Sequence, residues 1–438
     1  MACAAIDPLQ TSAAKCRDKT CSDTMDLQYR GGSAFCRDGR MKIQFDDPLF
    51  EAWTQRFLFT MPEGGCEIGE IKATAARIPE GNRDAWYREW TATADRLFAD
   101  AEASAAHGSR VSARYLYLRA STYYRMSYPL LYGRPTDPRV KAGYAREAEA
   151  FTHAAALFEP PIVPVAIPFA GTTLPGWFYS GGPGTRPLII GTNGYDETVQ
   201  IMHYGHAAAA QRRGYHVLTF DGPGQGRVLI EDGVPMRPDW ETVIRVVVDF
   251  ALTLPSVDPE RIALAGWSFG GYLAPRAASG EQRLAALIAD PGQWDLIAAI
   301  RAIFPRLGVS AEVAKALPDV DEAALEPAFA AIRENPQLNW SFVQRGLWVH
   351  GVRTLMDYLR VCVAFRLSDR VSAIRCPTLV TTAENDPVAA FAERLYDALM
   401  CPKTLIRFTA AEGAGDHCEA SARSVYFQRA YDWLDGAC

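Results

Sequence analysis

A serine between two glycines carries the most chemical information in this chain. The segment Gly266-Trp267-Ser268-Phe269-Gly270 follows a short apolar run and precedes a stretch with helical spacing. This Gly-x-Ser-x-Gly pattern is typical of a nucleophile elbow, in which a sharp turn between a strand and a helix exposes the serine hydroxyl. A serine hydroxyl is a weak nucleophile at neutral pH and needs a neighbouring base. The pattern therefore predicts Ser268 as a catalytic nucleophile.

Two later loops supply candidates for the base and for an acid that orients it. An apolar run over residues 377–382 leads into a turn with Asp386, and a glycine-rich loop before the last helical stretch contains His417. The order serine, acid, histidine fits a Ser-His-Asp triad. Glu384 is the competing acid, but Asp386 is favoured because it lies deeper in the turn and is followed by a proline. The other histidines are interpreted as surface or packing residues, of which the last could face the pocket: His107, His153, His203, His206, His216 and His350.

An oxyanion hole is needed as well, because attack on a carbonyl places negative charge on its oxygen. The backbone NH of Phe269, directly after the serine, is the first expected donor. The second is expected from the loop that follows the apolar run 187–191, at Gly194 or Tyr195. The sequence leaves the choice between these two residues open.

No metal or organic cofactor is expected. The sequence has no His-Glu-x-x-His motif and no paired carboxylates at metal-ligand spacing. The glycine-rich segment 221–226 lacks the spacing of a phosphate-binding loop and is expected to precede no immediate helix, so it is interpreted as a structural turn after a strand.

The elements that must position these residues follow an alternating pattern. Short apolar runs alternate with helical spacing, which predicts a mostly parallel sheet with helices on both faces. An antiparallel hairpin is expected over 162–169 and 173–179. Further strands are expected at 187–191, 215–220, 261–265, 284–290, 377–382 and 404–408, and helices at 198–213, 240–254, 272–279, 389–399 and 419–434.

Five segments are predicted along the chain. Residues 1–40 have little periodicity and are expected to form a flexible arm. Residues 41–158 form a helical module, with helices over 85–105, 111–132 and 140–158. The first part of an α/β core covers 159–295, a helical lid insertion covers 296–370, and the second part of the core covers 371–438.

Composition narrows the class of partner. The chain has 438 residues, of which 49% are hydrophobic and 22% charged, with a formal net charge of −6. This balance argues against nucleic-acid and membrane partners. The expected partner is a small-molecule substrate of the candidate triad. Without a signal-like start or an apolar run of about 20 residues, we expect a cytoplasmic protein. The ten cysteines are dispersed without a Cys-x-x-Cys pair, so free thiols are expected.

Several motifs together resemble one branch of the α/β-hydrolases. They are the elbow, the acid and histidine loops, and the segments 120–125 (Ala-Ser-Thr-Tyr-Tyr-Arg), 193–197 (Asn-Gly-Tyr-Asp-Glu), 220–226 (Phe-Asp-Gly-Pro-Gly-Gln-Gly) and 236–241 (Met-Arg-Pro-Asp-Trp-Glu). The branch has an N-terminal helical module and includes 2,6-dihydroxypseudooxynicotine hydrolase and fungal heptaketide-shortening hydrolases. The resemblance spans residues from about 110 to 430.

The resemblance implies cleavage of a C–C bond next to a ketone in an aryl ketone or polyketide-type substrate, through an acyl-enzyme. It places Tyr124 and Arg125 near a pocket between module and core, although a helix-surface ion pair is an equal interpretation of Arg125. Trp267 is a further expected substrate contact, and Asp290 or Asp295 could serve as an additional pocket acid. The resemblance also implies a homodimer.

Other functions use the same three residues. A carboxylesterase or lactonase differs only in its leaving group, and an acyltransferase of natural-product biosynthesis replaces water by an alcohol or amine. A binding protein without activity is disfavoured, because it has no need of Ser268, Asp386 and His417 together.

Overall fold

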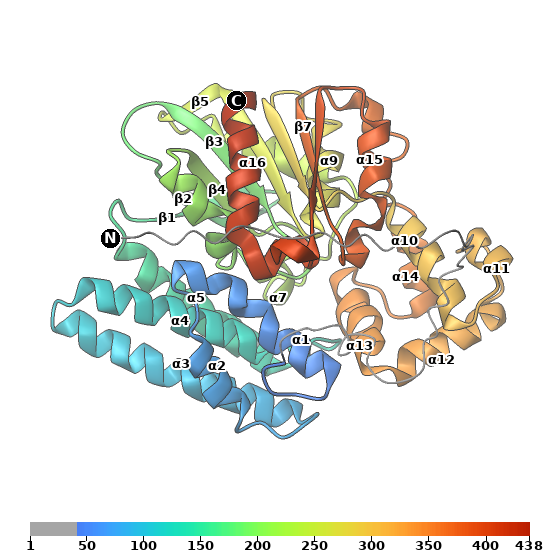
Figure 1. Ribbon diagram of the computed structural model, residues 1–438, viewed down its shortest axis with the longest axis horizontal. Coiled ribbons are helices and arrows are strands. Elements are labelled where there is room, and N and C mark those ends of the chain that lie inside the picture. Colours follow the sequence, from blue (N-terminus) through green and yellow to red (C-terminus); the bar gives the residue numbers. More distant parts are fainter. Residues whose placement is uncertain (1–41) are drawn as a thin grey trace, which may run out of the picture. The chain divides into compact units, whose positions relative to one another are not determined.

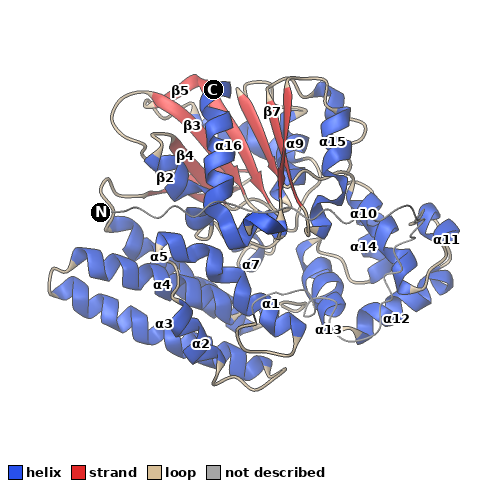
Figure 2. Cartoon of the chain, in the orientation of Figure 1, coloured by secondary structure: helices blue, strands red, loops and turns tan. Residues whose placement is uncertain are grey.

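An eight-stranded sheet forms the centre of the computed structural model, which describes residues 42–438 (Figures 1 and 2). Its strand order is β1-β2-β4-β3-β5-β6-β7-β8. The pairs β1/β2 and β2/β4 are antiparallel, and the five remaining pairs are parallel. The strands are β1 (Val163–Phe169), β2 (Thr172–Tyr179), β3 (Arg186–Thr192), β4 (His216–Phe220), β5 (Val257–Trp267), β6 (Ala286–Asp290), β7 (Thr378–Ala383) and β8 (Lys403–Phe408). The predicted mostly parallel sheet is confirmed.

Helices cover both faces of this sheet, which explains why its central strands are apolar throughout. Helices α6 (Ala208–Arg212) and α16 (Arg423–Ala437) pack on one face, and α8 (Trp240–Ala251) and α9 (Gly270–Ala278) pack on the other, where α15 (Ala392–Ala398) also lies (Figure 1). Every residue of β4 and of β6 is buried. Edge strand β1 is more exposed and contains two prolines, which an edge tolerates because one side makes no ladder hydrogen bonds.

Helices also dominate the chain before the sheet. They are α1 (Pro48–Arg56), η1 (Phe57–Glu63), α2 (Ile68–Ala75), α3 (Arg83–Ala106), α4 (Arg110–Ser127), η2 (Pro129–Leu131) and α5 (Pro138–Ala156). Trp86, Trp90 and Tyr123 are fully buried between them, and the Trp86 indole donates to the Met126 carbonyl at 2.7 Å. The aromatic residues of this segment therefore form a helix-packing core.

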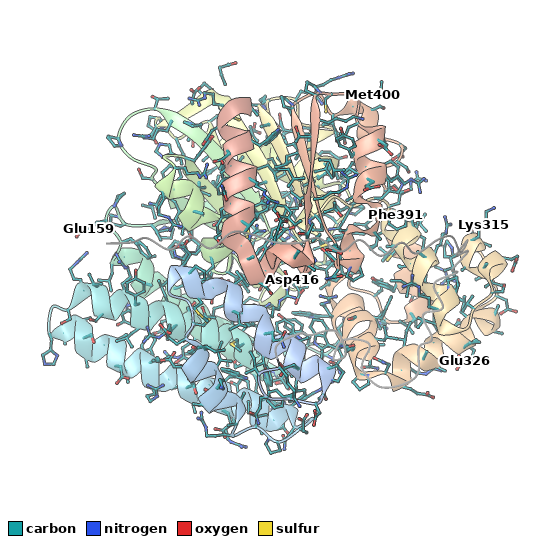
Figure 3. All side chains as sticks on the ribbon, viewed as in Figure 1. Glu159, Lys315, Glu326, Phe391, Met400 and Asp416 are labelled. Carbon is teal, nitrogen blue, oxygen red and sulfur yellow. The ribbon has the colours of Figure 1, made fainter. Side chains whose placement is uncertain are left out.

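The insertion predicted as a lid, for which the name lid is kept below, has a small hydrophobic core of its own. It consists of α10 (Leu296–Ile303), η4 (Phe304–Leu307), α11 (Ala311–Ala316), η5 (Glu322–Leu325), α12 (Glu326–Glu334), α13 (Pro336–Leu338), the π-helix η6 (Asn339–Leu347) and α14 (Leu355–Cys362). Phe304, Leu325 and Phe329 pack inside it, whereas Lys315 and Glu326 point outward (Figure 3). Two tryptophans attach it to the helical module, since the Trp340 indole donates to the Pro129 carbonyl at 2.8 Å and the Trp348 indole to Thr136 at 3.1 Å.

Three predicted helices differ from those observed. The helix expected over 198–213 is a π-helix, η3 (His203–Ala207), followed by α6, and the indole of Trp267 packs closely on Gly205 there. The helix expected over 111–132 ends at Ser127, because Pro129 has no backbone NH with which to continue the helical hydrogen bonds. The helix expected over 419–434 begins at Arg423, after a kinked 3-10 segment, η10 (His417–Ala422).

The turn 221–226 also differs from the prediction in one respect. A short helix, α7 (Gly226–Ile230), follows it directly. The buried Asp221 carboxylate of the turn accepts from the Arg227 NH at 3.1 Å, which satisfies one free NH group in the first turn of this helix. The remaining short 3-10 segments are η7 (Val371–Ala373), η8 (Pro387–Phe391) and η9 (Ala410–Glu412).

Some expectations concern parts of the chain outside this description. The flexible arm predicted for 1–40 and four of the ten cysteines lie outside the described residues. The six cysteines within residues 42–438 are free thiols. None of the helices in this range combines the length and the apolar character that crossing a bilayer requires.

One buried carboxyl joins the helical module to the core. Glu147 on α5 is fully buried, and its two carboxyl oxygens accept hydrogen bonds from Tyr128 and from Thr198 of the core. Burial raises the pKa of Glu147 to about 8, so the group is neutral at pH 7 in the folded protein.

We predict that Glu147→Gln flattens the pH dependence of stability. The folded-state pKa of about 8 lies above the ordinary value of 4.5. Between these two pH values the folded protein therefore holds a proton on Glu147 that the unfolded chain has lost. The wild-type free energy of unfolding therefore falls as pH rises from about 5 to about 8, and the glutamine variant should fall less. Urea unfolding at stepped pH measures this. Glu149→Gln, an exposed change on the same helix, should keep the wild-type slope; parallel slopes for all three proteins would contradict the prediction.

Candidate active site

Ser268 lies in a strained turn between β5 and α9. Its backbone has φ of 57°, the left-handed region that non-glycine residues seldom adopt. Gly266 and Gly270 permit this turn, because a Cβ on Gly266 would lie 1.9 Å from the Gly270 carbonyl oxygen and one on Gly270 2.6 Å from that of Thr192. The structure thus has the strand, turn and helix that the elbow motif requires.

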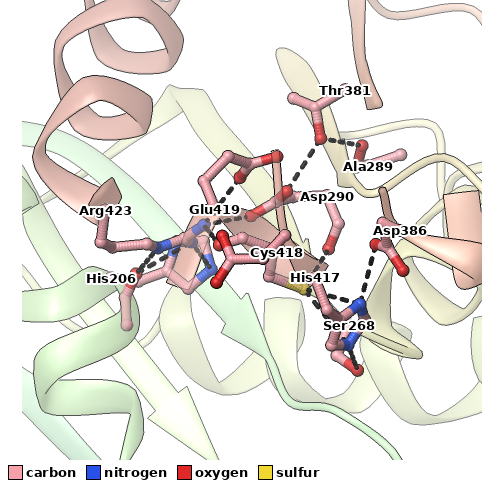
Figure 4. Close-up of polar contacts among 12 residues, drawn as sticks. His206, Ser268, Ala289, Asp290, Thr381, Asp386, His417, Cys418, Glu419 and Arg423 are labelled. Atoms are coloured by element: carbon pink, nitrogen blue, oxygen red, sulfur yellow. Dashed lines mark hydrogen bonds and ion pairs between the residues drawn. The ribbon is translucent and has the colours of Figure 1, made fainter. Parts of the chain in front are cut away.

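The three residues predicted as a triad form one hydrogen-bonded chain. The Ser268 hydroxyl lies 2.9 Å from Nε2 of His417, and Nδ1 of His417 lies 2.8 Å from Oδ2 of Asp386 (Figure 4). The Asp386 side chain is fully buried, whereas the His417 side chain is 34% exposed. A buried carboxylate on one ring nitrogen and a hydroxyl on the other is the arrangement in which imidazole acts as a general base.

The acid loop and the histidine loop are held together directly. The Asn385 NH donates to the Gly415 carbonyl at 2.7 Å, and the second oxygen of Asp386 accepts from the Val388 NH at 2.9 Å. Glu384, the competing acid, is exposed and accepts instead from the Ala410 NH at 2.8 Å. The structure therefore brings Asp386, and not Glu384, to His417.

A buried charge network lies directly behind His417. Cys418 and Glu419 both have left-handed backbone, with φ of 53° and 50°. Arg423 donates to the Cys418 carbonyl at 2.9 Å, to Glu419 at 3.2 Å and to Asp290 at 2.6 Å (Figure 4). Burial raises the pKa of Glu419 well above its ordinary value. This network supports the unfavourable backbone that presents the imidazole to the serine.

The two candidates for an additional pocket acid are placed elsewhere, so that prediction is corrected. Asp290 is fully buried, and its carboxylate accepts from Arg423 and, at 2.8 Å, from Thr381. Asp295 precedes α10 and accepts from the backbone NH groups of Leu367 and Ser368 at 2.8 and 2.9 Å. Both carboxylates already accept hydrogen bonds from groups within the protein. Asp290 does so in the network behind His417, and Asp295 does so at a loop of the lid.

The loop after β3 lies beside the serine, as the oxyanion-hole prediction requires. A Cβ on Gly194 would lie 3.1 Å from Cβ and 3.5 Å from Oγ of Ser268. The Gly194 NH donates to the Asn193 side chain at 2.9 Å, whereas the NH groups of Phe269 and Tyr195 donate to no group within residues 42–438. Of the two alternatives, Tyr195 is therefore better suited than Gly194 as the second donor.

Gln225 holds this loop and was not recognised in the sequence. Its side-chain NH₂ donates to the carbonyls of Asn193 at 2.9 Å and of Gly194 at 2.8 Å, and its oxygen accepts from the Gly222 NH. The sequence predicts only a structural turn over 221–226, whereas in the structure this turn fixes the loop beside the serine. The only sequence signal was its place after a strand near the same sheet edge.

Arg125 meets the same loop from the helical module. Its guanidinium is fully buried and lies 2.8 Å from the Glu197 carboxylate. Arg56 of α1 also contacts Glu197, at 3.1 Å, and Arg345 of η6 contacts Asp196 at 3.3 Å. Module, core and lid therefore meet at two acids next to Tyr195. Arg125 is not a helix-surface ion pair, and neither Arg56 nor Arg345 was expected here.

Tyr124 and Trp267 are placed by packing. The Tyr124 hydroxyl donates to Asp95 at 2.5 Å and accepts from Arg146 at 2.7 Å, between α3 and α5, so the structure does not bring Tyr124 to the site as predicted. The neighbouring side chain on a helix points about 100° away, which separates Tyr124 from Arg125. Trp267 packs edge-on against Phe59 of η1 at 5.1 Å and under Arg423. A contact between Trp267 and substrate stays a prediction.

Sequence comparison assigns the family. The profile of the alpha/beta hydrolase family matches residues 170–427, which include the elbow, the acid loop and the histidine loop. This chain belongs to the alpha/beta hydrolase family.

The full-length relatives are fungal hydrolases. Hydrolase LUC6 of a Fusarium species is 34% identical over 409 residues, covering 89% of this chain and 97% of that protein. The 20-hydroxy-prefusarin hydrolase of Gibberella moniliformis is 35% identical over 409 residues with the same coverage. Since both alignments extend well before residue 170, the similarity includes the helical module as well as the core.

Solved structures agree on the fold. The crystal structure of 2,6-dihydroxy-pseudo-oxynicotine hydrolase superposes with a TM-score of 0.68 at 24% identity, covering 87% of this chain and 95% of that chain. Together with the sequence relatives, this confirms the resemblance inferred from the motifs. Within residues 42–438, no group of three or more His, Cys, Asp and Glu side chains is arranged to hold a metal ion.

We predict that Arg423→Met destabilises the protein strongly. The substitution keeps much of the side-chain volume but leaves Asp290 and Glu419 buried without their cation. Breaking a buried ion pair in this way costs roughly 3–5 kcal/mol of unfolding free energy, measured by denaturant titration. Arg407→Ala breaks an exposed pair with Glu393 and should cost less than about 1 kcal/mol. Equal stability of the two variants would show that the network behind His417 is not needed.

Proposed function

We propose that this protein is a serine hydrolase that cleaves a C–C bond next to a ketone in an aryl ketone or polyketide-type substrate. The observation that carries the proposal is the continuous hydrogen-bonded chain from the Ser268 hydroxyl through His417 to the buried Asp386. A left-handed serine at the carboxyl end of β5 and NH donors beside it complete the machinery for attack on a carbonyl.

The first chemical step forms an acyl-enzyme. Nε2 of His417 accepts the Ser268 proton while Oγ attacks the ketone carbon, and Asp386 stabilises the resulting imidazolium. The NH groups of Phe269 and Tyr195 donate to the oxyanion. When the tetrahedral intermediate collapses, the C–C bond breaks and its electron pair passes to the leaving carbon, where a β-carbonyl or hydroxylated ring delocalises it. The imidazolium then protonates that carbon or the oxygen conjugated with it.

The second step releases the acid. His417 takes a proton from water, the hydroxide attacks the acyl carbonyl, and Ser268 leaves with the proton that His417 returns. No other reactant is required for atoms and charges to balance. The substrate class is supported by the fungal relatives, one of which is named for a prefusarin substrate, and by the resemblance to the branch described above.

We predict that Ser268→Ala abolishes turnover and leaves the fold intact. Purified wild type and variant should be compared on a hydroxylated aryl β-diketone and on a simple aryl ester, with products identified by mass. Cleavage of the diketone by the wild type but not by the variant supports the proposal.

Asp386→Asn should lower kcat by about 10⁴-fold, because the imidazole loses the partner that sets its tautomer.

Other outcomes select other functions. Ester cleavage alone would make the protein a carboxylesterase or lactonase, and product formation only with an added alcohol or amine would make it an acyltransferase. Diketone cleavage that survives in Ser268→Ala would contradict the nucleophile assignment.

We predict that Gly194→Ala lowers kcat by roughly 10- to 100-fold at only a small cost in stability. Its Cβ would lie 3.5 Å from the Ser268 hydroxyl oxygen, where the attacked carbonyl must fit. The φ angle of Gly194 lies outside the left-handed region, so alanine adds crowding rather than backbone strain. Gly69→Ala, on α2 with open space around it, is the matched control and should keep wild-type kcat. If kcat did not change in Gly194→Ala, the attacked carbonyl of the substrate would not lie beside Gly194, and the prediction would be wrong.

A further inference from the structure

A buried histidine of the lid has no hydrogen-bond partner. His350 lies between η6 and α14 and is only 5% exposed. Both of its ring nitrogens are buried, and neither makes a hydrogen bond to any group within residues 42–438. Buried polar groups in folded proteins are nearly always paired, so an imidazole with two unmet nitrogens requires an explanation.

Aromatic rings surround this imidazole. The rings of Phe365, Tyr195 and Tyr358 lie 4.8, 5.4 and 5.4 Å from it. Burial alone lowers the pKa of His350 to about 3, so the ring is neutral at physiological pH. A neutral imidazole offers one donor and one acceptor, which is the complement of a hydroxyl group.

Two of the three rings that surround His350, here called the aromatic cage, also lie next to the ring of Phe269 in the elbow. Tyr195 packs edge-on against Phe269 of the elbow, with ring centroids 5.1 Å apart. Phe365, on the other side of His350, lies 6.1 Å from the same Phe269 ring. The residue before Tyr195 is Gly194, which abuts Ser268. His350 is thus separated from the elbow by a single layer of rings.

The Tyr195 hydroxyl is a second buried polar group in the same place. It interacts with the Tyr358 hydroxyl, and it meets full hydrogen-bond geometry with no group within residues 42–438. Arg345 lies 5.0 Å over the Tyr195 ring, but its guanidinium is paired with Asp196. The imidazole of His350 is therefore unpartnered, and the Tyr195 hydroxyl beside it has only a loose contact with Tyr358.

The lid backbone at this point is fixed to the core. The Val349 carbonyl accepts from the Met236 NH at 2.9 Å, and the His350 NH donates to the Gly346 carbonyl at 3.2 Å. The imidazole is therefore held in position before any ligand arrives, as a recognition group must be.

We propose that His350 and the Tyr195 hydroxyl form a subsite that binds a hydroxyl group of the substrate, a phenol or the enol of a β-diketone, and so holds the neighbouring ketone at Ser268. The inference rests on the proposed function for its substrate class. It adds a residue from the lid to substrate recognition and explains why the lid is tied to the loop beside the serine.

Binding without turnover tests this proposal. The probes are a hydroxylated aryl β-diketone and its O-methyl ether, titrated calorimetrically into Ser268→Ala and into Ser268→Ala combined with His350→Phe. Phenylalanine keeps a ring in the cage but removes both hydrogen-bonding atoms. We expect the Kd of the hydroxylated probe to rise about 10- to 100-fold and that of the ether to change little. Tyr195→Phe should show the same selective loss, and His350→Gln should restore part of the hydroxyl preference.

Stability gives an independent readout. Since the imidazole has no internal partner, His350→Phe should unfold at the same temperature as the wild type or at a higher one. His107→Phe, a change on the module surface, is the matched control and should leave both Kd values unchanged.

Each other outcome is decisive. If the Kd of both probes rose equally in the His350→Phe variant, His350 would contribute only its shape, and the hydroxyl subsite would be wrong. Unchanged Kd values, or no binding of either probe, would also overturn the subsite. A failure of the proposed function gives a different result. In that case Ser268→Ala would still cleave the diketone, although binding of the hydroxylated probe in preference to its ether would still depend on His350.

Discussion

Asp290 holds together the three loops on which the site depends. Its backbone carbonyl accepts from the Ser268 NH at 2.7 Å, its carboxylate accepts from Thr381 of β7, and the same carboxylate pairs with Arg423 behind His417. The serine, acid and histidine loops are thus all tied to the last residue of β6. Burying the Asp290 carboxylate costs free energy, but it is paired with Arg423 and accepts a hydrogen bond from Thr381. These interactions offset the strain of the left-handed backbone at Ser268, Cys418 and Glu419.

A second junction joins the accessory segments to the core. Asp196 and Glu197 follow Tyr195, and they receive Arg125 and Arg56 from the helical module and Arg345 from the lid. On the core side, Gln225 fixes the two carbonyls just before Tyr195. The loop beside the serine is therefore shaped by all three parts of the chain, so the module and the lid belong to the site as much as the sheet does.

In the fungal relatives the sequence similarity likewise extends over the helical module as well as the core. A hydrolase core alone would supply the serine, acid and histidine. The loop beside Ser268, however, has its two acids paired with arginines of the module and the lid. The aromatic cage around His350 likewise takes rings from the lid and from the core.

Local signals in the sequence were sufficient for the sheet, the elbow and the order of Ser268, Asp386 and His417. Apolar periodicity defines strands and helices, and the motif residues follow strands whose carboxyl ends meet at one edge. The misplaced boundaries had identifiable causes, such as Pro129, whose missing NH ends the hydrogen bonds of α4.

Sequence could not determine which polar residues meet across the fold. Tyr124 and Arg125 are neighbours in the chain, yet one packs between module helices and the other pairs with Glu197 of the core. Asp290 has the position of a pocket acid, but its role was decided by Arg423, which lies 133 positions later. Side-chain partners depend on how separate elements pack, and burial then decides whether a charge is paired, neutral or free. The sequence by itself determined the fold and the three residues that we propose react; only the tertiary structure decided what surrounds them, because side-chain partners are set by packing.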